Sequence, residues 1–275
     1  MADTAHDAVA DAPADSNRGL ERLTADQRRT WRDAIAFYAA SLSRKDAIFD
    51  APLPAIVRAL ADGGDAARVP DAEDIDAPLR STLERAAPFY REAWWPSHRA
   101  ANVARRDDVQ ALVDRHGAAV PGFITRAYGL AWAADGYQVH LSAWANWAGA
   151  YSTTGNLLVM SSLDRATRGF YGLETVFHEG MHQWDRAIND LLFAQARRAG
   201  KRLPPNVSHG VIFFTAGEAV RRVTPDYVPY AEANGLWAAG FQRFKAPLEE
   251  TWKPYLDGNG TRDEALAALI ARVGS

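Results

Sequence analysis

Apolar residues recur at helical spacing through the first part of the chain. From Thr24, which with Gln27 matches a capping box, Trp31, Ile35, Tyr38 and Leu42 follow at intervals of three and four. This pattern predicts an amphipathic helix. Similar patterns predict helices over residues 46–61, 79–90 and 97–116, with breaks at residues 62–64 and at Gly117. Residues 20–118 are therefore predicted to form a mainly helical portion.

The pattern changes after Pro121, where alternation replaces the helical period. Residues 137–142 alternate between apolar and polar side chains, directly after the hairpin turn signal Asp135-Gly136. The Trp-rich segment 143–151 and the run 156–160 follow, and we expect these three segments to be consecutive strands of a small sheet. Trp144 and Trp147 are interpreted as sheet and core packing rather than as a ligand platform, because aromatic residues favour strands.

Helical spacing returns after Gly172 and continues to the end of the chain. Leu173, Phe177, Met181, Trp184, Ile188 and Leu191 form one apolar stripe. The stripe predicts a long helix reaching about Ala199, followed by a break at Pro204-Pro205, a helix over 210–223 and two or three more. The order of helices, sheet and helices predicts an α+β fold. Residues 119–275 would make up its second portion, forming one compact unit with 20–118.

Composition narrows the possible partners. The 275 residues include 31 Lys and Arg against 34 Asp and Glu, a net charge of -3, with no concentrated basic face, so we expect no nucleic-acid partner. No apolar run reaches the 18 or more residues of a membrane span. The first 19 residues are rich in Ala and Asp and predict a disordered tail without the features of a secretory signal. Compartment and oligomeric state stay open, because an exported chain trimmed of its signal would look the same.

The candidate chemistry lies in the segment His178-Glu179-Gly180-Met181-His182, an H-E-x-x-H motif. The chain has no cysteine, so a transition metal must be held by His, Asp or Glu. Histidines four apart on a helix are neighbours on one face, and both imidazoles can reach one ion while Glu179 projects to the side. Zinc lowers the pKa of its water from about 15.7 to about 7. The motif thus predicts a Zn²⁺ site in which Glu179 accepts the proton of that water as general base.

With this motif, the part of the chain from roughly Tyr137 to Arg222 resembles the zincin metallopeptidases. The resemblance implies a small mixed sheet before the active-site helix, with an edge strand, here Asn156 to Met160, antiparallel to a bound peptide or protein substrate. The longer metzincin motif is absent, because Asp185 and Ile188 occupy the positions of its glycine and third histidine. The chain is more similar to the gluzincin branch, whose third ligand is a Glu on a following helix.

Glu218 is the predicted third ligand, because it lies in an otherwise apolar helix where an uncompensated carboxylate is costly to bury. The alternative is a salt bridge from Glu218 to Arg221 or Arg222. His209 is the rival ligand. Nine residues along one helix leave His209 and Glu218 about half a turn out of phase, so only one of them is expected to bind the ion. Otherwise His209 would cap this helix or donate a hydrogen bond to the reacting oxyanion.

The chain departs from the thermolysin-like members of that branch at two positions. Phe214 and Arg222 stand where those proteins have an Asn and an Asp, and the Asp is a partner of a metal-bound imidazole. Asp185 is the candidate substitute, with an ion pair to Arg186 or Arg197 as the alternative.

Tyr227 and Tyr230 are candidate donors to the oxyanion, with packing as the alternative for each. The sequence thus predicts a zinc-dependent metallopeptidase. The alternative is a zincin-like metal-binding protein with a non-proteolytic hydrolase or ligand-binding role.

Overall fold

The computed structural model describes residues 18–64, 68–153 and 157–275, which divide into two compact units. Unit 1 holds the described residues up to 106 together with 139–153 and 157–165, and unit 2 holds 107–138 and 166–275. The sequence division at residue 118 differs from this one, because the strands group with the N-terminal helices rather than with the histidine motif. Of the predicted tail, residues 1–17 lie outside the described residues, while residues 18 and 19 begin a helical turn.

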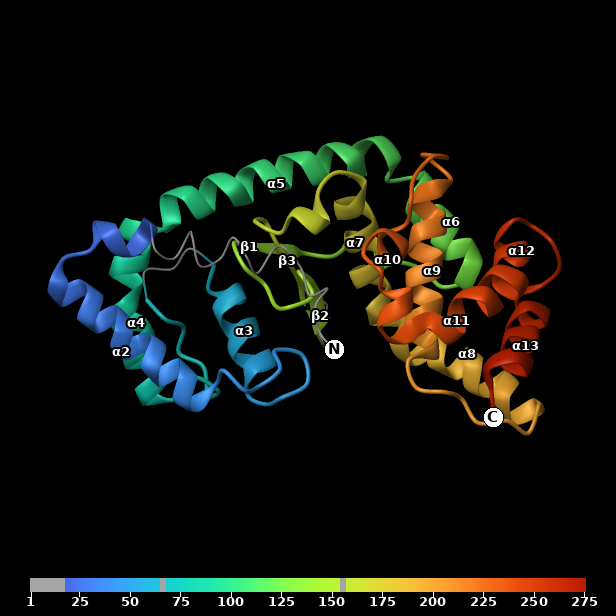
Figure 1. Cartoon of the computed structure of the whole chain (residues 1–275), viewed down its shortest axis with the longest axis horizontal. Helices are drawn as coiled ribbons and strands as arrows, with labels where there is room; N and C mark the ends of the chain where they lie inside the picture. The colour runs from blue at the N-terminus through green and yellow to red at the C-terminus, as the bar shows by residue number, and fades with distance from the viewer. Residues whose placement is uncertain (1–17, 65–67, 154–156) are drawn as a thin grey trace. The chain divides into compact units, whose positions relative to one another are not determined.

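Unit 1 contains the helices α2 (Ala25–Ser41), α3 (Leu53–Asp62) and α4 (Ala77–Ala93), and the unit boundary falls within α5 (Trp95–His116) (Figure 1). The predicted capping box is confirmed, because the Thr24 hydroxyl accepts the Gln27 N–H and the Gln27 side chain accepts the Thr24 N–H. The helix predicted over 46–61 begins only at Leu53. The Asp46 carboxylate accepts the N–H groups of Ile48 and Phe49, a local turn that competes with helix formation.

The sheet of unit 1 has three strands, β1 (Val139–Ser142), β2 (Ala150–Thr153) and β3 (Leu157–Ser161), in the order β1-β3-β2. It is mixed, as predicted: β3 is parallel to β1 and antiparallel to β2. The prediction that Asn156 to Met160 forms an edge strand is wrong, because β3 is central and all five of its residues are buried. Asn156 itself lies outside the described residues. Both sides of β3 are already paired, so no further strand can add to it.

The segment between β1 and β2 is irregular rather than a strand, which changes the interpretation of its tryptophans. Trp147 is 69% exposed, so its predicted core role is wrong, and Trp144 is half-buried. Side chains in an irregular segment do not alternate between an inner and an outer face as they do in a strand. The Asp135-Gly136 turn also makes no hairpin, because β1 is the first strand after it and pairs in parallel with β3.

Unit 2 is helical in its described part. Its elements are α6 (Ala119–Tyr128), which the sequence did not predict, then α7 (Phe170–Met181), a 3-10 turn (His182–Trp184), α8 (Asp185–Arg198), α9 (Val207–Arg221), α10 (Tyr230–Ala233), α11 (Gln242–Pro247), α12 (Lys253–Leu256) and α13 (Arg262–Val273). A 3-10 turn (Arg165–Thr167) comes before α7, and π-helical turns cover Trp237–Phe241 and Leu248–Trp252. The single helix predicted to reach Ala199 is thus two helices joined by a tighter turn.

The helix α9 is the centre of unit 2 and packs against α6, α7, α8, α10 and α11 (Figure 1). Eleven of its fifteen residues are buried, as expected of a helix that is apolar on all sides. The predicted stripe packs into the same core, where Leu173, Met181 and Ile188 are almost fully buried. Side chains carried by α7 and α9 are therefore held between closely packed helices.

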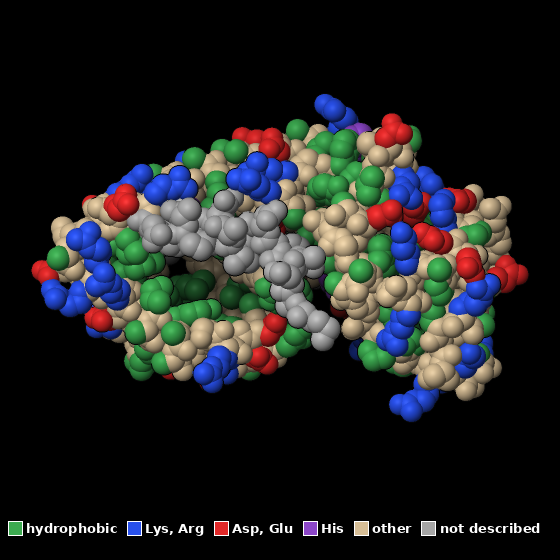
Figure 2. Space-filling model, viewed as in Figure 1, with side chains coloured by type: hydrophobic (Ala, Val, Ile, Leu, Met, Phe, Trp, Pro, Cys, Tyr) green, Lys and Arg blue, Asp and Glu red, His purple; other side chains and the backbone are tan. Residues whose placement is uncertain are grey.

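Within the described ranges, no helix combines the length and the apolar composition needed to cross a lipid bilayer. On the face shown in Figure 2, acidic and basic side chains are interspersed over the surface.

Candidate metal centre

The helix α7 brings the two histidines of the motif together. His178 lies in its last turn and is buried, and His182 begins the 3-10 turn that follows. Their Nε2 atoms are 3.2 Å apart, so the two rings face one point from adjacent turns. The spacing of four residues therefore has the geometric effect expected from helical periodicity.

The third imidazole comes from His209 in the first turn of α9. This helix begins after Pro204, Pro205 and Asn206, whose left-handed backbone (φ 64°) suits Asn better than most residues. His209 Nε2 lies 3.1 Å from His178 Nε2. One ligand atom from each of His178, His182 and His209 lies within 4.8 Å of the others, the one such group of three or more found among the described residues.

Asp185 fixes the orientation of His182. Its two carboxylate oxygens lie 3.0 and 3.2 Å from His182 Nδ1. A carboxylate accepts hydrogen bonds, so Nδ1 carries the proton, and when the ring is neutral its Nε2 lone pair faces the other histidines. Sequence reasoning proposed Asp185 as an imidazole partner, and the structure pairs it with His182.

The electrostatics of the cluster favour neutral imidazoles at two of its three positions. Burial, with the nearby His182 and His209, holds the pKa of His178 well below its usual value. Burial and His182 likewise lower the pKa of His209 to about 4, against the opposing effect of Asp185. Burial also opposes the charged form of His182, but the Asp185 hydrogen bond and the charges of Glu179 and Asp185 outweigh it and raise the pKa of His182. Neutral imidazole is the form that binds metal.

The donor set fits a divalent transition metal. A hydrogen bond between two ring nitrogens needs one donor and one acceptor, so three converging Nε2 atoms cannot all be satisfied by one another. A cation accepts a lone pair from each of them. Three imidazoles suit zinc, copper, iron or nickel, and three protein ligands leave a catalytic zinc site with one open position.

Aromatic rings enclose one side of the cluster. The Phe213 ring lies 4.1 Å from the His178 ring and 4.6 Å, nearly parallel, from the His209 ring, measured between centroids. Phe241 meets the His209 ring edge-on at 5.5 Å. These contacts restrict rotation of the two imidazoles and keep water from that side.

Glu179 and Gly180 complete the motif. Glu179 is half-buried, and its charge acts on His182. A Cβ added at Gly180 would lie 3.0 Å from the Trp132 ring, which packs against Trp184 and Phe177. The absence of a side chain at Gly180 therefore leaves room for an aromatic ring from the loop after α6.

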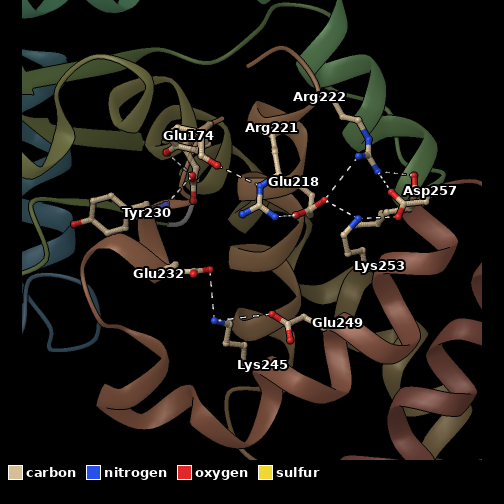
Figure 3. Close-up of polar contacts among 12 residues, drawn as sticks. Glu174, Glu218, Arg221, Arg222, Tyr230, Glu232, Lys245, Glu249, Lys253 and Asp257 are labelled. Carbon is tan, nitrogen blue, oxygen red and sulfur yellow. Dashed lines mark hydrogen bonds and ion pairs between the residues drawn. The ribbon is translucent and has the colours of Figure 1, made fainter. Parts of the chain in front are cut away.

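Glu218 is not brought to the histidines. It is 2% exposed, and its carboxylate lies 2.7 Å from Arg221, 3.8 Å from Arg222 and 3.6 Å from Lys253 (Figure 3). The salt-bridge alternative therefore describes its surroundings. The prediction that His209 and Glu218 do not share an ion agrees with this geometry, but the residue that reaches the histidine pair is His209.

Tyr227 and Tyr230 hold a buried carboxyl group that sequence reasoning missed. The Tyr227 hydroxyl donates to Glu174 Oε2 at 2.6 Å, and the Tyr230 backbone N–H donates to the same atom at 3.0 Å. Burial raises the pKa of Glu174 to about 7, although these two hydrogen bonds and Arg221 lower it. The sequence could have indicated a buried carboxyl group here, because Glu174 lies in an apolar helical run just as Glu218 does.

Both tyrosines are buried, and the Tyr227 hydroxyl is already bonded to Glu174 rather than free to reach an oxyanion at the histidines. Glu174, four positions before His178 on α7, thereby links this helix to the segment that follows α9. The contacts of Tyr227 match the packing alternative.

Comparison with known proteins adds no assignment: no family model, no curated protein and no solved structure matches this chain.

Proposed function

We propose that this protein is a metal-dependent hydrolase that cleaves peptide bonds, with His178, His182 and His209 as ligands and Glu179 as general base. The observation that carries the proposal is the convergence of three imidazole Nε2 atoms, two of the contacts being 3.1 and 3.2 Å. His209 replaces Glu218 as the proposed third ligand. Zinc is the proposed ion, because a three-histidine set with an open position is a recognised catalytic zinc site.

The residues around the cluster divide the chemistry between them. A zinc ion held here supplies Lewis acidity, which activates water at neutral pH and polarises a carbonyl. Glu179, next to His178 in the chain, takes a proton from the attacking water and returns it to the leaving amine. Asp185 holds the His182 ring in the tautomer that presents Nε2. Phe213 packs against the His178 and His209 rings and limits their rotation.

A non-proteolytic hydrolase is the second candidate, and one observation favours it. The peptide substrate was expected to pair with the strand at 156–160, but β3 is central and already paired on both sides. Without a free strand to pair with a peptide, the H-E-x-x-H motif is the remaining basis for proposing a peptide substrate. Hydrolysis of an ester or another acyl compound requires the same attack by an activated water.

The proposal is tested by measuring metal content and hydrolysis together. The full chain is purified without added metal and its zinc, copper, iron and nickel are quantified by mass spectrometry. It is then assayed against a fluorogenic peptide library and a panel of acyl esters, with and without chelator. Bound metal with chelator-sensitive peptide cleavage supports the peptidase, and cleavage of esters alone supports the second candidate. Protein that binds none of these metals contradicts both.

A further inference from the structure

A second candidate site lies in unit 2, in a cavity of about 260 Å³ beside α9. Its apolar wall is made by Phe213 and Phe214 of α9, Pro229 and Trp237. Phe213 also packs on His178 and His209, so this one ring borders both the cavity and the histidine cluster. Pockets for drug-sized ligands span roughly 300–1,000 Å³, so this cavity suits something smaller.

One charged group of the cavity has an excess of positive charge. Arg221 and Lys253 line it, and both contact the buried Glu218 (Figure 3). Behind them Arg222 and Lys253 each bond Asp257. These five residues contain three cations and two carboxylates. Arg221 also lies near the buried Glu174 (Figure 3), whose pKa burial raises to about 7, so Glu174 adds only part of a third negative charge at neutral pH. Glu218 also lines the cavity, but its side chain is only 2% exposed, against 33% for Arg221 and 35% for Lys253, so the two cations are the more accessible groups.

The other charged group has the opposite excess. Lys245 lies 3.5 Å from Glu232 and 3.9 Å from Glu249, and all three side chains line the cavity. Figure 3 shows this group apart from the one around Glu218, with Lys245 between its two carboxylates. Glu232 and Glu249 are about half exposed, so their outer oxygens are accessible. One cation against two carboxylates leaves a net negative charge.

We propose that this cavity binds a small zwitterion with an apolar side chain, a free amino acid or a dipeptide. The ligand carboxylate contacts Arg221 and Lys253, and its ammonium group contacts Glu232 and Glu249. The apolar side chain lies against Phe213, Phe214 and Trp237. Opposite charge excesses at two places select a molecule with both charges, since a single ion would be opposed by one of them. The site does not depend on the proposed hydrolysis, because none of the metal-binding histidines lines it.

Binding is tested by calorimetry on the full chain in the presence of EDTA, which removes the metal centre as an alternative site. The probes are phenylalanine, the dipeptide Phe-Leu, N-acetylphenylalanine and phenylalaninamide. We expect one of the two zwitterions to bind about tenfold or more tightly than either capped compound, because each cap removes one charged contact. Tighter binding of phenylalanine identifies the amino acid as the ligand, and tighter binding of Phe-Leu identifies the dipeptide.

Two glutamates next to each other in the chain provide a matched pair of variants. Glu249 lines the cavity, whereas Glu250 pairs with Arg272 and does not. We expect Glu249→Gln to weaken the zwitterion and the amide severalfold and to leave the acetylated compound unchanged. Glu250→Gln should leave all four affinities unchanged. Equal effects of the two substitutions, absence of zwitterion binding at millimolar concentration, or binding seen only without EDTA would each overturn the proposal.

Discussion

His178 on α7 and His209 on α9 place their Nε2 atoms 3.1 Å apart, although 31 residues separate them in the chain. Burial lowers the pKa of both rings, so two neutral imidazoles face each other in the core of unit 2. His178 Nε2 is also 3.2 Å from His182 Nε2, and one N–H cannot serve both contacts. A cation held between the three rings would satisfy all three Nε2 atoms.

The first prediction separates the two candidate third ligands. His209→Ala should lower zinc content to a small fraction of the parent's, because two imidazoles bind far more weakly than three. Glu218→Gln should retain the metal, since its carboxylate contacts Arg221 and Lys253 instead. Metal is measured on the folded fraction of each variant, with circular dichroism as the check on folding. Retention by His209→Ala and loss by Glu218→Gln would reverse the assignment.

The second prediction concerns the proposed base. Glu179→Gln keeps the size of the side chain but cannot accept a proton, so we expect turnover to fall by about 10²–10⁴-fold with zinc content unchanged. Hydrolysis is measured with the best substrate found in the library, in parallel with metal analysis. A Glu179→Gln protein that is fully loaded and as active as the parent rules out this role.

The third prediction tests the orientation of His182 by Asp185. Asp185→Asn replaces the acceptor of the His182 Nδ1 proton by a neutral amide, and loss of such a partner typically weakens metal binding by about 10–100-fold. Competition with a fluorescent chelator measures the affinity. Asp190→Asn, an exposed position on the same helix, is the matched control. If the two variants bind zinc equally well, Asp185 makes no contribution through His182.

Local patterns predicted the elements of the site better than their assembly. The capping box at Thr24 and the apolar stripe through Leu173 and Ile188 depend on residues near one another in the chain, and both are present. Whether His209 or Glu218 lies beside the histidine pair depends on which face of α9 packs against α7, and the chain pattern carries no such information. Likewise, the central position of β3 depends on pairing with β1, which is set by long-range contacts.

The fourth prediction distinguishes packing from catalysis at Tyr227. Its hydroxyl donates to the buried Glu174 at 2.6 Å, so Tyr227→Phe should cost about 1–3 kcal/mol of unfolding free energy. Turnover per folded, metal-loaded molecule should change little. Urea unfolding and steady-state kinetics measure the two effects separately. A large fall in turnover with unchanged stability would instead restore Tyr227 as an oxyanion donor.

The fifth prediction follows from the pKa of Glu174, which burial raises from 4.5 to about 7. Well below pH 4.5 this carboxyl group is protonated in both states. As the pH rises from 4.5 to 7, the unfolded chain loses the proton first, so stability falls with rising pH. At 1.36 kcal/mol for each pH unit, the loss is on the order of 3 kcal/mol.

Glu174→Gln should lack this loss and therefore gain stability relative to the parent over the same interval, measured by urea unfolding at pH 4.5 and 7.5. Glu250→Gln, on the surface, should follow the parent, and a Glu174→Gln protein that also does so would show that Glu174 ionises alike in the folded and unfolded states.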